Sequence, residues 1–107
     1  MQSDRYERIR GHVLNAITDD YEAIEQILED LRTWHPELAA SEAEVIAALR
    51  DIVGLRWAKA YRPNLTGYLR VVDGVPDAET CKFACFLITQ QGRRALDLLP
   101  EAWFPEY

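Results

Sequence analysis

Basic side chains recur along one segment of a chain that is acidic overall, and they offer the chemistry of phosphate contact. These bases are Arg56, Lys59, Arg62 and Arg70. Residues 56–94 hold seven bases and three acids, a net charge of +4, whereas the whole chain carries −6. Each phosphate contact needs a cation that releases counterions. The segment is therefore a candidate anion-binding surface, and the alternative is an ordinary solvated sheet face.

Charge divides the 107 residues into two unlike halves. Residues 1–54 hold 12 acids and 5 bases, and residues 55–107 hold 6 acids and 7 bases. The overall balance argues against a general affinity for polyanions. An anion-facing surface is therefore expected only in the second half. The length and ordinary composition predict one domain, residues 1–107, with a modest core.

Residues that commonly carry catalysis or metal binding are few. His12 and His35 lie in no recognisable nucleophile or metal motif. His12 lies next to the apolar stripe of the first helix, as a structural histidine would. Cys81 and Cys85 are predicted to lie on one side of a strand as buried, reduced thiols, because a zinc site needs about four ligands. We therefore expect no enzyme, no cofactor and no metal.

The N-terminal stretch MQSDRYERIRGHV has no apolar run of signal-peptide length, and no segment reaches the length of a membrane span. Two cysteines without a secretion signal fit a reducing compartment. The expectation is a cytoplasmic protein with no membrane partner.

Helical spacing of apolar residues predicts two helices before residue 35. The first covers about 4–17, with Asp4 as its cap. The second covers about 20–34, and Asp19 with Glu22 forms a capping pair at its start.

A third helix is predicted to begin at Ser41, which forms a capping box with Glu44. Gly54 suits the left-handed residue that closes a helix. The buried stripe of this helix should be Val45, Leu49, Ile52 and Val53.

The second half changes to the alternation of strands. Residues 55–62 are predicted to form a strand with one wetter face, Tyr68 to Val72 a second, and Cys81 to Ile88 an inner strand that is apolar on both faces. Thr89 should cap a short last helix that Pro100 ends.

Two stretches resemble known proteins. SEAEVIAALRDIVGLRWAKAYR, residues 41–62, looks like a third helix entering a first wing strand, and FLITQQGRRAL, residues 86–96, is similar to a common winged-helix ending. Over about residues 5–99 the chain resembles winged-helix domains of MarR-like and PadR-like bacterial regulators. The resemblance implies an α+β fold: a three-helix core, a small antiparallel sheet with its wing, and a short C-terminal helix.

The same resemblance implies that the third helix meets double-stranded DNA in the major groove. Arg50 would then read guanine through its bidentate fork, and Arg56, Lys59, Arg62 and Arg70 would contact phosphate. The outward positions of the helix are expected to be Glu42, Glu44, Ala47, Arg50 and Asp51. Three of these are acidic and repel phosphate. The acidity favours the competing hypothesis, a winged-helix module that binds protein and not DNA.

Aromatic residues are many for a small domain. Trp34 and Trp57 are expected in the core or at its edge. The tail EAWFPEY brings Trp103, Phe104 and Tyr107 beyond the last helix, where they either pack back onto the domain or anchor a partner chain. The partner would be another protein or, as the resemblance implies, a second copy in a homodimer.

Overall fold

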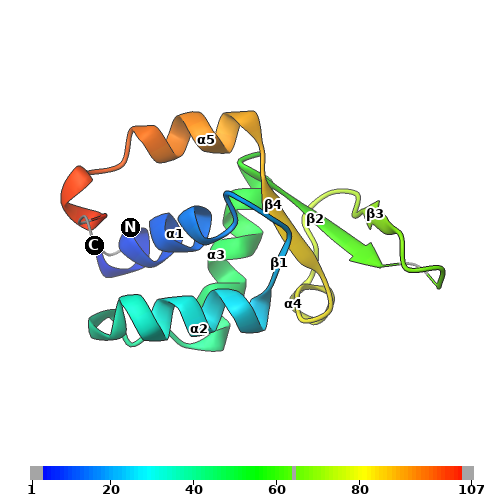
Figure 1. Ribbon diagram of the computed structural model, residues 1–107, viewed down its shortest axis with the longest axis horizontal. Coiled ribbons are helices and arrows are strands. Elements are labelled where there is room, and N and C mark those ends of the chain that lie inside the picture. The colour runs from blue at the N-terminus through cyan, green and yellow to red at the C-terminus, as the bar shows by residue number, and fades with distance from the viewer. Residues whose placement is uncertain (1–3, 64, 105–107) are drawn as a thin grey trace.

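Helices α1, α2 and α3 lie to one side of a small sheet, and a two-stranded ribbon projects from the other side (Figure 1). The computed structural model describes residues 4–63 and 65–104, and over these residues the fold is α+β. The elements in chain order are α1 Asp4–Ala16, β1 Glu22–Ala23, α2 Ile24–Trp34, η1 Pro36–Leu38, α3 Glu42–Gly54, β2 Ala58–Pro63, β3 Leu69–Val71, α4 Ala78–Cys81, β4 Cys85–Ile88, α5 Gln90–Asp97 and η2 Glu101–Trp103.

The core lies between the three longer helices and one face of the sheet. Its largest fully buried side chains are Phe86, Ile9, Leu14, Ile17, Ile27, Leu49, Ile52, Val13 and Val45. Helix α3 places Val45, Leu49 and Ile52 inside, as predicted, and leaves Val53 half-buried. Burying such aliphatic side chains contributes about 1.5–3 kcal/mol each. No helix in the described ranges has the length and apolar character needed to cross a membrane.

The sheet is antiparallel, with strand order β1-β4-β2-β3. Strand β2 joins its two halves: Ala58 to Tyr61 pair with β4, and Tyr61 to Pro63 pair with β3. Ala58 and Ala60 point to the core, and their small side chains let the helices approach the sheet closely. The distal part of β2 has left the core, so it forms the projecting ribbon with β3 (Figure 1).

The prediction that α2 begins at residue 20 was wrong. Glu22 and Ala23 instead form strand β1, paired with Phe86 and Cys85 of β4. Ala23 is the residue before the helix, and no side chain caps it. The backbone of Glu22 bonds to a strand distant in the sequence, so the predicted capping pair with Asp19 does not form. Helix α1 covers Asp4–Ala16, close to the predicted 4–17, and Asp4, the predicted cap, lies in its first turn.

The prediction of one strand from Cys81 to Ile88 was also wrong. The Asp77 carboxylate accepts a hydrogen bond of 2.7 Å from the Thr80 amide and starts the short helix α4. Cys81 therefore ends a helix and Cys85 begins a strand, so the two thiols do not share a strand face. Both cysteines are unpaired, and burial raises the pKa of each thiol.

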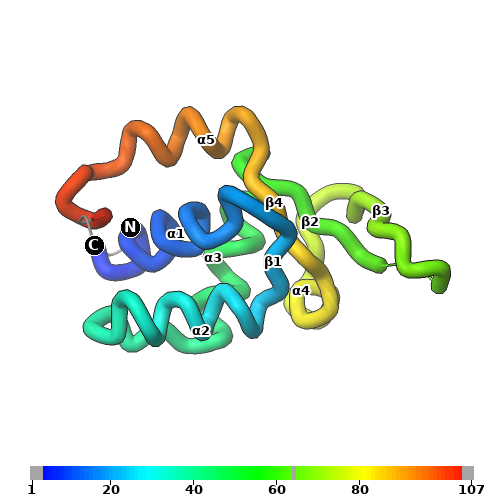
Figure 2. The backbone as a smooth tube through the Cα atoms, in the orientation of Figure 1, coloured from blue at the N-terminus to red at the C-terminus, as the bar shows by residue number. Residues whose placement is uncertain are grey.

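The C-terminal segment returns to the first helix. Thr89 caps α5 as predicted, by accepting a hydrogen bond from the Gly92 amide, but the helix ends at Asp97, before Pro100. Figure 2 shows the chain after α5 turning back toward the start of α1. Trp103 then lies against Gly11 of α1.

Two other tryptophans differ in their placement. Trp57 is half-buried at the core edge, as expected, with the Arg10 guanidinium 5.4 Å from its ring centroid. Trp34 was predicted in the core or at its edge and is instead 57% exposed, at the last residue of α2.

Candidate functional site

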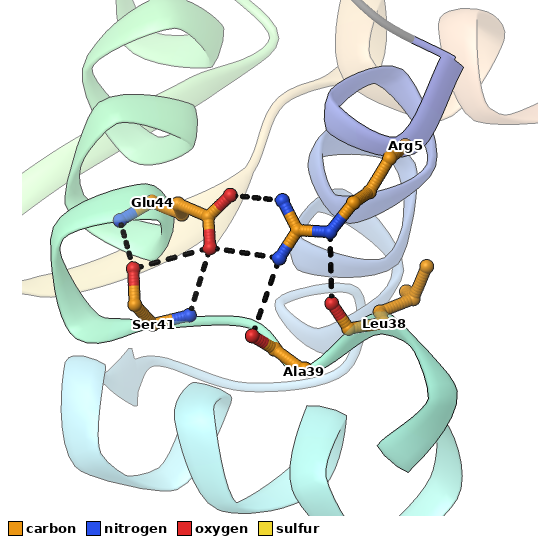
Figure 3. Close-up of polar contacts among 5 residues, drawn as sticks. All are labelled: Arg5, Leu38, Ala39, Ser41 and Glu44. Atoms are coloured by element: carbon orange, nitrogen blue, oxygen red, sulfur yellow. Dashed lines mark hydrogen bonds and ion pairs between the residues drawn. The ribbon is translucent and has the colours of Figure 1, made fainter.

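The acids of α3 lie differently from the sequence expectation. Arg5 of α1 forms a two-pronged ion pair with the Glu44 carboxylate and also donates to the carbonyls of Leu38 and Ala39 (Figure 3). Glu44 completes the predicted capping box with Ser41. Arg5, and then the Ser41 hydrogen bonds, lower the pKa of Glu44 to about 2.

The carboxylate of Asp51 also contacts helix α1, through Tyr6. It accepts a 2.5 Å hydrogen bond from the Tyr6 hydroxyl. Burial, and then this bond, raise the pKa of Tyr6. Glu44 and Asp51 are half-buried and engage α1, so the expectation that both point outward was wrong. The exposed positions of α3 include Glu42, Ala47 and Arg50.

Arg50 is positioned by a loop. Its Nε donates a 2.9 Å hydrogen bond to the Pro76 carbonyl, which follows the turn after β3. A guanidinium anchored through Nε keeps its two terminal nitrogens directed away from that bond. This arrangement reduces the conformational freedom that the side chain would lose on binding.

Arg56 occupies the position that a glycine usually takes at the end of a helix. The Arg56 amide donates to Val53 and the Trp57 amide to Ile52, which is the Schellman pattern. Arg56 has φ 65°, whereas Gly54 is an ordinary helical residue, so the closing role predicted for Gly54 was wrong. A residue with a bulky side chain rarely adopts a positive φ, because this conformation costs free energy. An exposed arginine at this position is therefore unusual.

Replacing Arg56 with glycine is expected to raise the free energy of unfolding by about 0.5–1 kcal/mol, because the left-handed strain is relieved. Urea unfolding measures the change. Arg56→Ala is the matched control, since it removes the same charge and keeps the strain. Equal free energies of unfolding for the two variants would contradict this account.

The ribbon brings two of the predicted anion-binding residues together. Arg62 of β2 and Arg70 of β3 are register partners, and both are exposed. Directly opposite residues have their Cβ atoms about 5 Å apart, so two like charges there repel each other. Residues 55–72 contain no acid. The ribbon therefore carries positive charge that no acid within residues 55–72 balances. A bound anion would reduce the repulsion between Arg62 and Arg70.

The remaining candidates are dispersed. Lys59 points to the opposite face of β2 from Arg62, by strand alternation. Arg56 and Lys59 both line a depression of about 690 Å³ between the ribbon and the start of α5. Arg93 donates a 2.6 Å hydrogen bond to the Thr18 carbonyl, which ties α5 to the turn after α1.

Comparison with known proteins adds no relative. No protein-family model matches the chain, and no curated protein or solved structure matches it either. The candidate sites are therefore judged on their own geometry.

A second site lies between α1 and α2, in a cleft of about 410 Å³. His12 forms part of its wall, stacked on His35 with ring centroids 3.6 Å apart and met edge-on by Phe104 at 5.0 Å. His12 is only 2% exposed, and neither ring nitrogen has a hydrogen-bond partner among the described residues. An unsatisfied buried polar group costs about 1–3 kcal/mol.

Burial also keeps the His12 ring neutral. Desolvation, and then the neighbouring His35 and Arg8, lower the pKa of His12 to about 4, although Glu37 opposes this. A neutral imidazole has one donor and one acceptor nitrogen. His12 is therefore uncharged near neutral pH, with a donor and an acceptor nitrogen that are both buried.

Part of the lining of the cleft is acidic. Asp19, Glu22 and Asp30 line it, and no lysine or arginine is among the lining residues. Burial, and then Asp30 and Asp20, raise the pKa of Glu22, as expected for a carboxylate among like charges. The described residues contain no cluster of three or more His, Cys, Asp or Glu that could hold a metal ion.

The cleft was not predicted from the sequence, in which His12 and His35 lie in separate helical and loop segments. Its members come from α1, the following turn, β1, the end of α2 and the C-terminal segment. No local motif links such distant positions. Trp34, next to His35 in the sequence, had been expected in the core or at its edge.

Proposed function

We propose that this chain is a winged-helix protein that binds double-stranded DNA, with the β2–β3 ribbon against the phosphate backbone and Arg50 toward base edges. The element order supports this fold, because a short strand separates the first two helices and the later strands follow the third helix. The strand order β1-β4-β2, with β3 beyond it in the wing, supports it further.

The observation that carries the proposal is the acid-free ribbon with Arg62 opposite Arg70. Such a pair weakens an isolated sheet but suits a surface that meets phosphates. The acidity of α3 is a smaller obstacle than its sequence suggests, because Arg5 and Tyr6 engage Glu44 and Asp51. A major groove would then face the exposed residues Ala43, Ala47 and Arg50.

Binding to a random-sequence duplex should therefore be measurable at about 20 mM salt and fall steeply as salt rises. Arg62→Glu is expected to weaken it at least about tenfold and to make the salt dependence shallower by about one unit, because a phosphate contact is lost. The same variant should melt no lower than the wild type, since the new carboxylate faces Arg70. Fluorescence anisotropy and thermal melting measure the two effects.

Arg32→Glu is the matched control, because it makes the same charge change at the far end of α2, away from the ribbon (Figure 1). It should bind within about twofold of the wild type, as a remote charge is largely screened. Equal weakening by Arg32→Glu would point to net charge and not to the ribbon. A wild-type chain that binds no duplex at low salt would exclude DNA binding.

A protein-interaction module is a second candidate, favoured by the outer face of the sheet. Tyr61 and Val71 are register partners there, and Tyr21 packs edge-on against Tyr61 at 5.0 Å. Val71 is 50% exposed and Tyr21 is 42% exposed. Trp103 and Phe104 pack toward α1, and Tyr107 lies outside the described residues. Concentration-dependent sedimentation of the wild type would favour self-association through one of these surfaces.

A further inference from the structure

Charges of opposite sign are gathered in two separate segments of the chain. Residues 19–30 hold six acids and no base, whereas residues 55–72 hold four bases and no acid. The first segment, which we call the acidic segment, runs from the turn after α1 through β1 into α2. The second contains both strands of the basic ribbon. The two segments are therefore electrostatically complementary.

The carboxylates of the acidic segment have no basic partner. Two of the six are half-buried, and the four exposed ones are Asp19, Asp20, Glu25 and Glu29. None of the six forms an ion pair with a lysine or arginine of residues 4–63 and 65–104. Burial, and then the charges of Asp30 and Asp20, raise the pKa of Glu22, so these three carboxylates lie near enough to repel one another.

The bases of the ribbon segment are likewise exposed and form no ion pair in the part of the chain that the structure describes; they are Arg56, Lys59, Arg62 and Arg70. Arg62 and Arg70 alternate along their strands with Tyr61 and Val71. The two arginines therefore lie on the opposite face of the ribbon from that apolar pair. A partner on this face meets charge rather than an apolar surface.

The two segments do not neutralise each other within one copy. Strands β1 and β3 are at opposite edges of the sheet, with β4 and β2 between them. Three strand spacings of about 4.8 Å place β1 about 14 Å from β3. The ribbon also projects away from α2 (Figure 1). Both segments are therefore available to a second copy of the chain.

The net charge of −6 opposes association, but it acts mostly through charges that are far from the contact. The molecule measures 41 × 31 × 25 Å, whereas the Debye length is about 10 Å at 0.1 M salt. Distant charges are therefore screened, and the facing carboxylates and guanidinium groups dominate. Exposed ion pairs are individually weak, so a measurable contact needs several of them.

We propose that the basic ribbon of one copy binds the acidic segment of a second copy, through ion pairs of Arg62 and Arg70 with carboxylates such as Glu25 and Glu29. The planar fork of an arginine suits this role, because it pairs with a carboxylate through two hydrogen bonds. Each copy uses a different surface, so the contact is heterologous and can continue into short chains. It does not depend on DNA binding.

Sedimentation equilibrium of the full chain tests the self-association. A dissociation constant on the order of 0.1–1 mM is expected at 0.1 M salt, since the contact consists of exposed ion pairs. The constant should rise at least about tenfold at 1 M salt, where the Debye length is about 3 Å. A chain that stays monomeric at 0.1 M salt up to about 1 mM protein would overturn the proposal. Association that is as strong at 1 M salt would overturn it too.

Two charge reversals identify the surfaces. Arg62→Glu on the ribbon and Glu29→Lys on α2 should each weaken self-association at least about fivefold. Glu29→Lys leaves α2 intact, because the new lysine follows Glu25 by one turn in the favourable order. It also reduces the net charge from −6 to −4, so general repulsion between copies cannot explain the loss.

An equimolar mixture of the two variants supplies one intact acidic segment and one intact ribbon. The mixture should therefore associate at least about fivefold more tightly than either variant alone. Glu101→Lys is the matched control, because this exposed residue at the start of η2 lies outside both segments. It should associate at least as tightly as the wild type. A mixture that associates no better than the separate variants would refute the contact, as would equal weakening by Glu101→Lys.

Discussion

Replacing Gly92 with alanine is expected to destabilise the fold by about 3 kcal/mol or more, the largest effect of any single methyl group that we predict. A Cβ at this position would lie 2.0 Å from the Trp57 carbonyl oxygen and 2.9 Å from its carbon. These are backbone atoms, and the Trp57 oxygen also accepts a hydrogen bond from the Thr89 amide. Neither of these atoms can move away from the new methyl group without separating α5 from the start of β2.

Urea unfolding of Gly92→Ala measures this effect, with Gly54→Ala as the matched control. A Cβ at Gly54 would meet Val75 at an ordinary 3.5 Å, and the residue is helical. The control should therefore be neutral or stabilising by up to about 1 kcal/mol. A Gly92→Ala chain as stable as the wild type would show that α5 does not approach Trp57 so closely.

This junction matters because it holds both candidate sites in place. Trp57 leads directly into β2 and the basic ribbon, and Thr89 links β4 to α5. The C-terminal segment that follows α5 carries Phe104 to the cleft. A shift of α5 would therefore disturb the base of the ribbon and one wall of the cleft together.

Local signals in the sequence were sufficient for some elements. The capping box of Ser41 and Glu44 and the Thr89 cap were predicted because each is complete within four residues. Strand β1 was missed because its two residues gain their hydrogen bonds from β4, more than sixty positions away. Helix α4 was missed because it has only four residues and ends at Cys81, where the apolar run of the predicted strand begins.

The same distinction applies to the candidate sites. The arginines of the ribbon were foreseen because bases in an extended segment are visible in the sequence itself. The contacts of Glu44 and Asp51 with α1 were not, since their partners Arg5 and Tyr6 are about forty residues distant. The pairing of His12 with His35 likewise depends on how α1 and α2 pack.

Acid is expected to destabilise the protein through His12. The unfolded chain binds the proton with the ordinary histidine pKa of about 6.5, whereas folding lowers the pKa to about 4. The unfolded state therefore takes up the proton first, and stability is lost as the pH falls from about 6.5 to about 4. The loss from this residue is at most about 3 kcal/mol. The charged or titratable neighbours of His12 are His35, Arg8 and Glu37.

His12→Met isolates that contribution, because it fills a similar volume without ionising. Urea unfolding at pH 7.5 and pH 4.5 should show a smaller acid loss in the variant, by about 2 kcal/mol. Glu44 also contributes to acid sensitivity, since its pKa lies below the ordinary value, but it does so equally in both chains. Identical acid losses in the two chains would mean that His12 titrates normally in the folded state.

At neutral pH the methionine variant is expected to be as stable as the wild type or more so, because two unsatisfied buried nitrogens disappear. Thermal melting at pH 7.5 measures this difference. A methionine variant that melts well below the wild type would show that the imidazole stabilises the fold through contacts such as its stacking on His35.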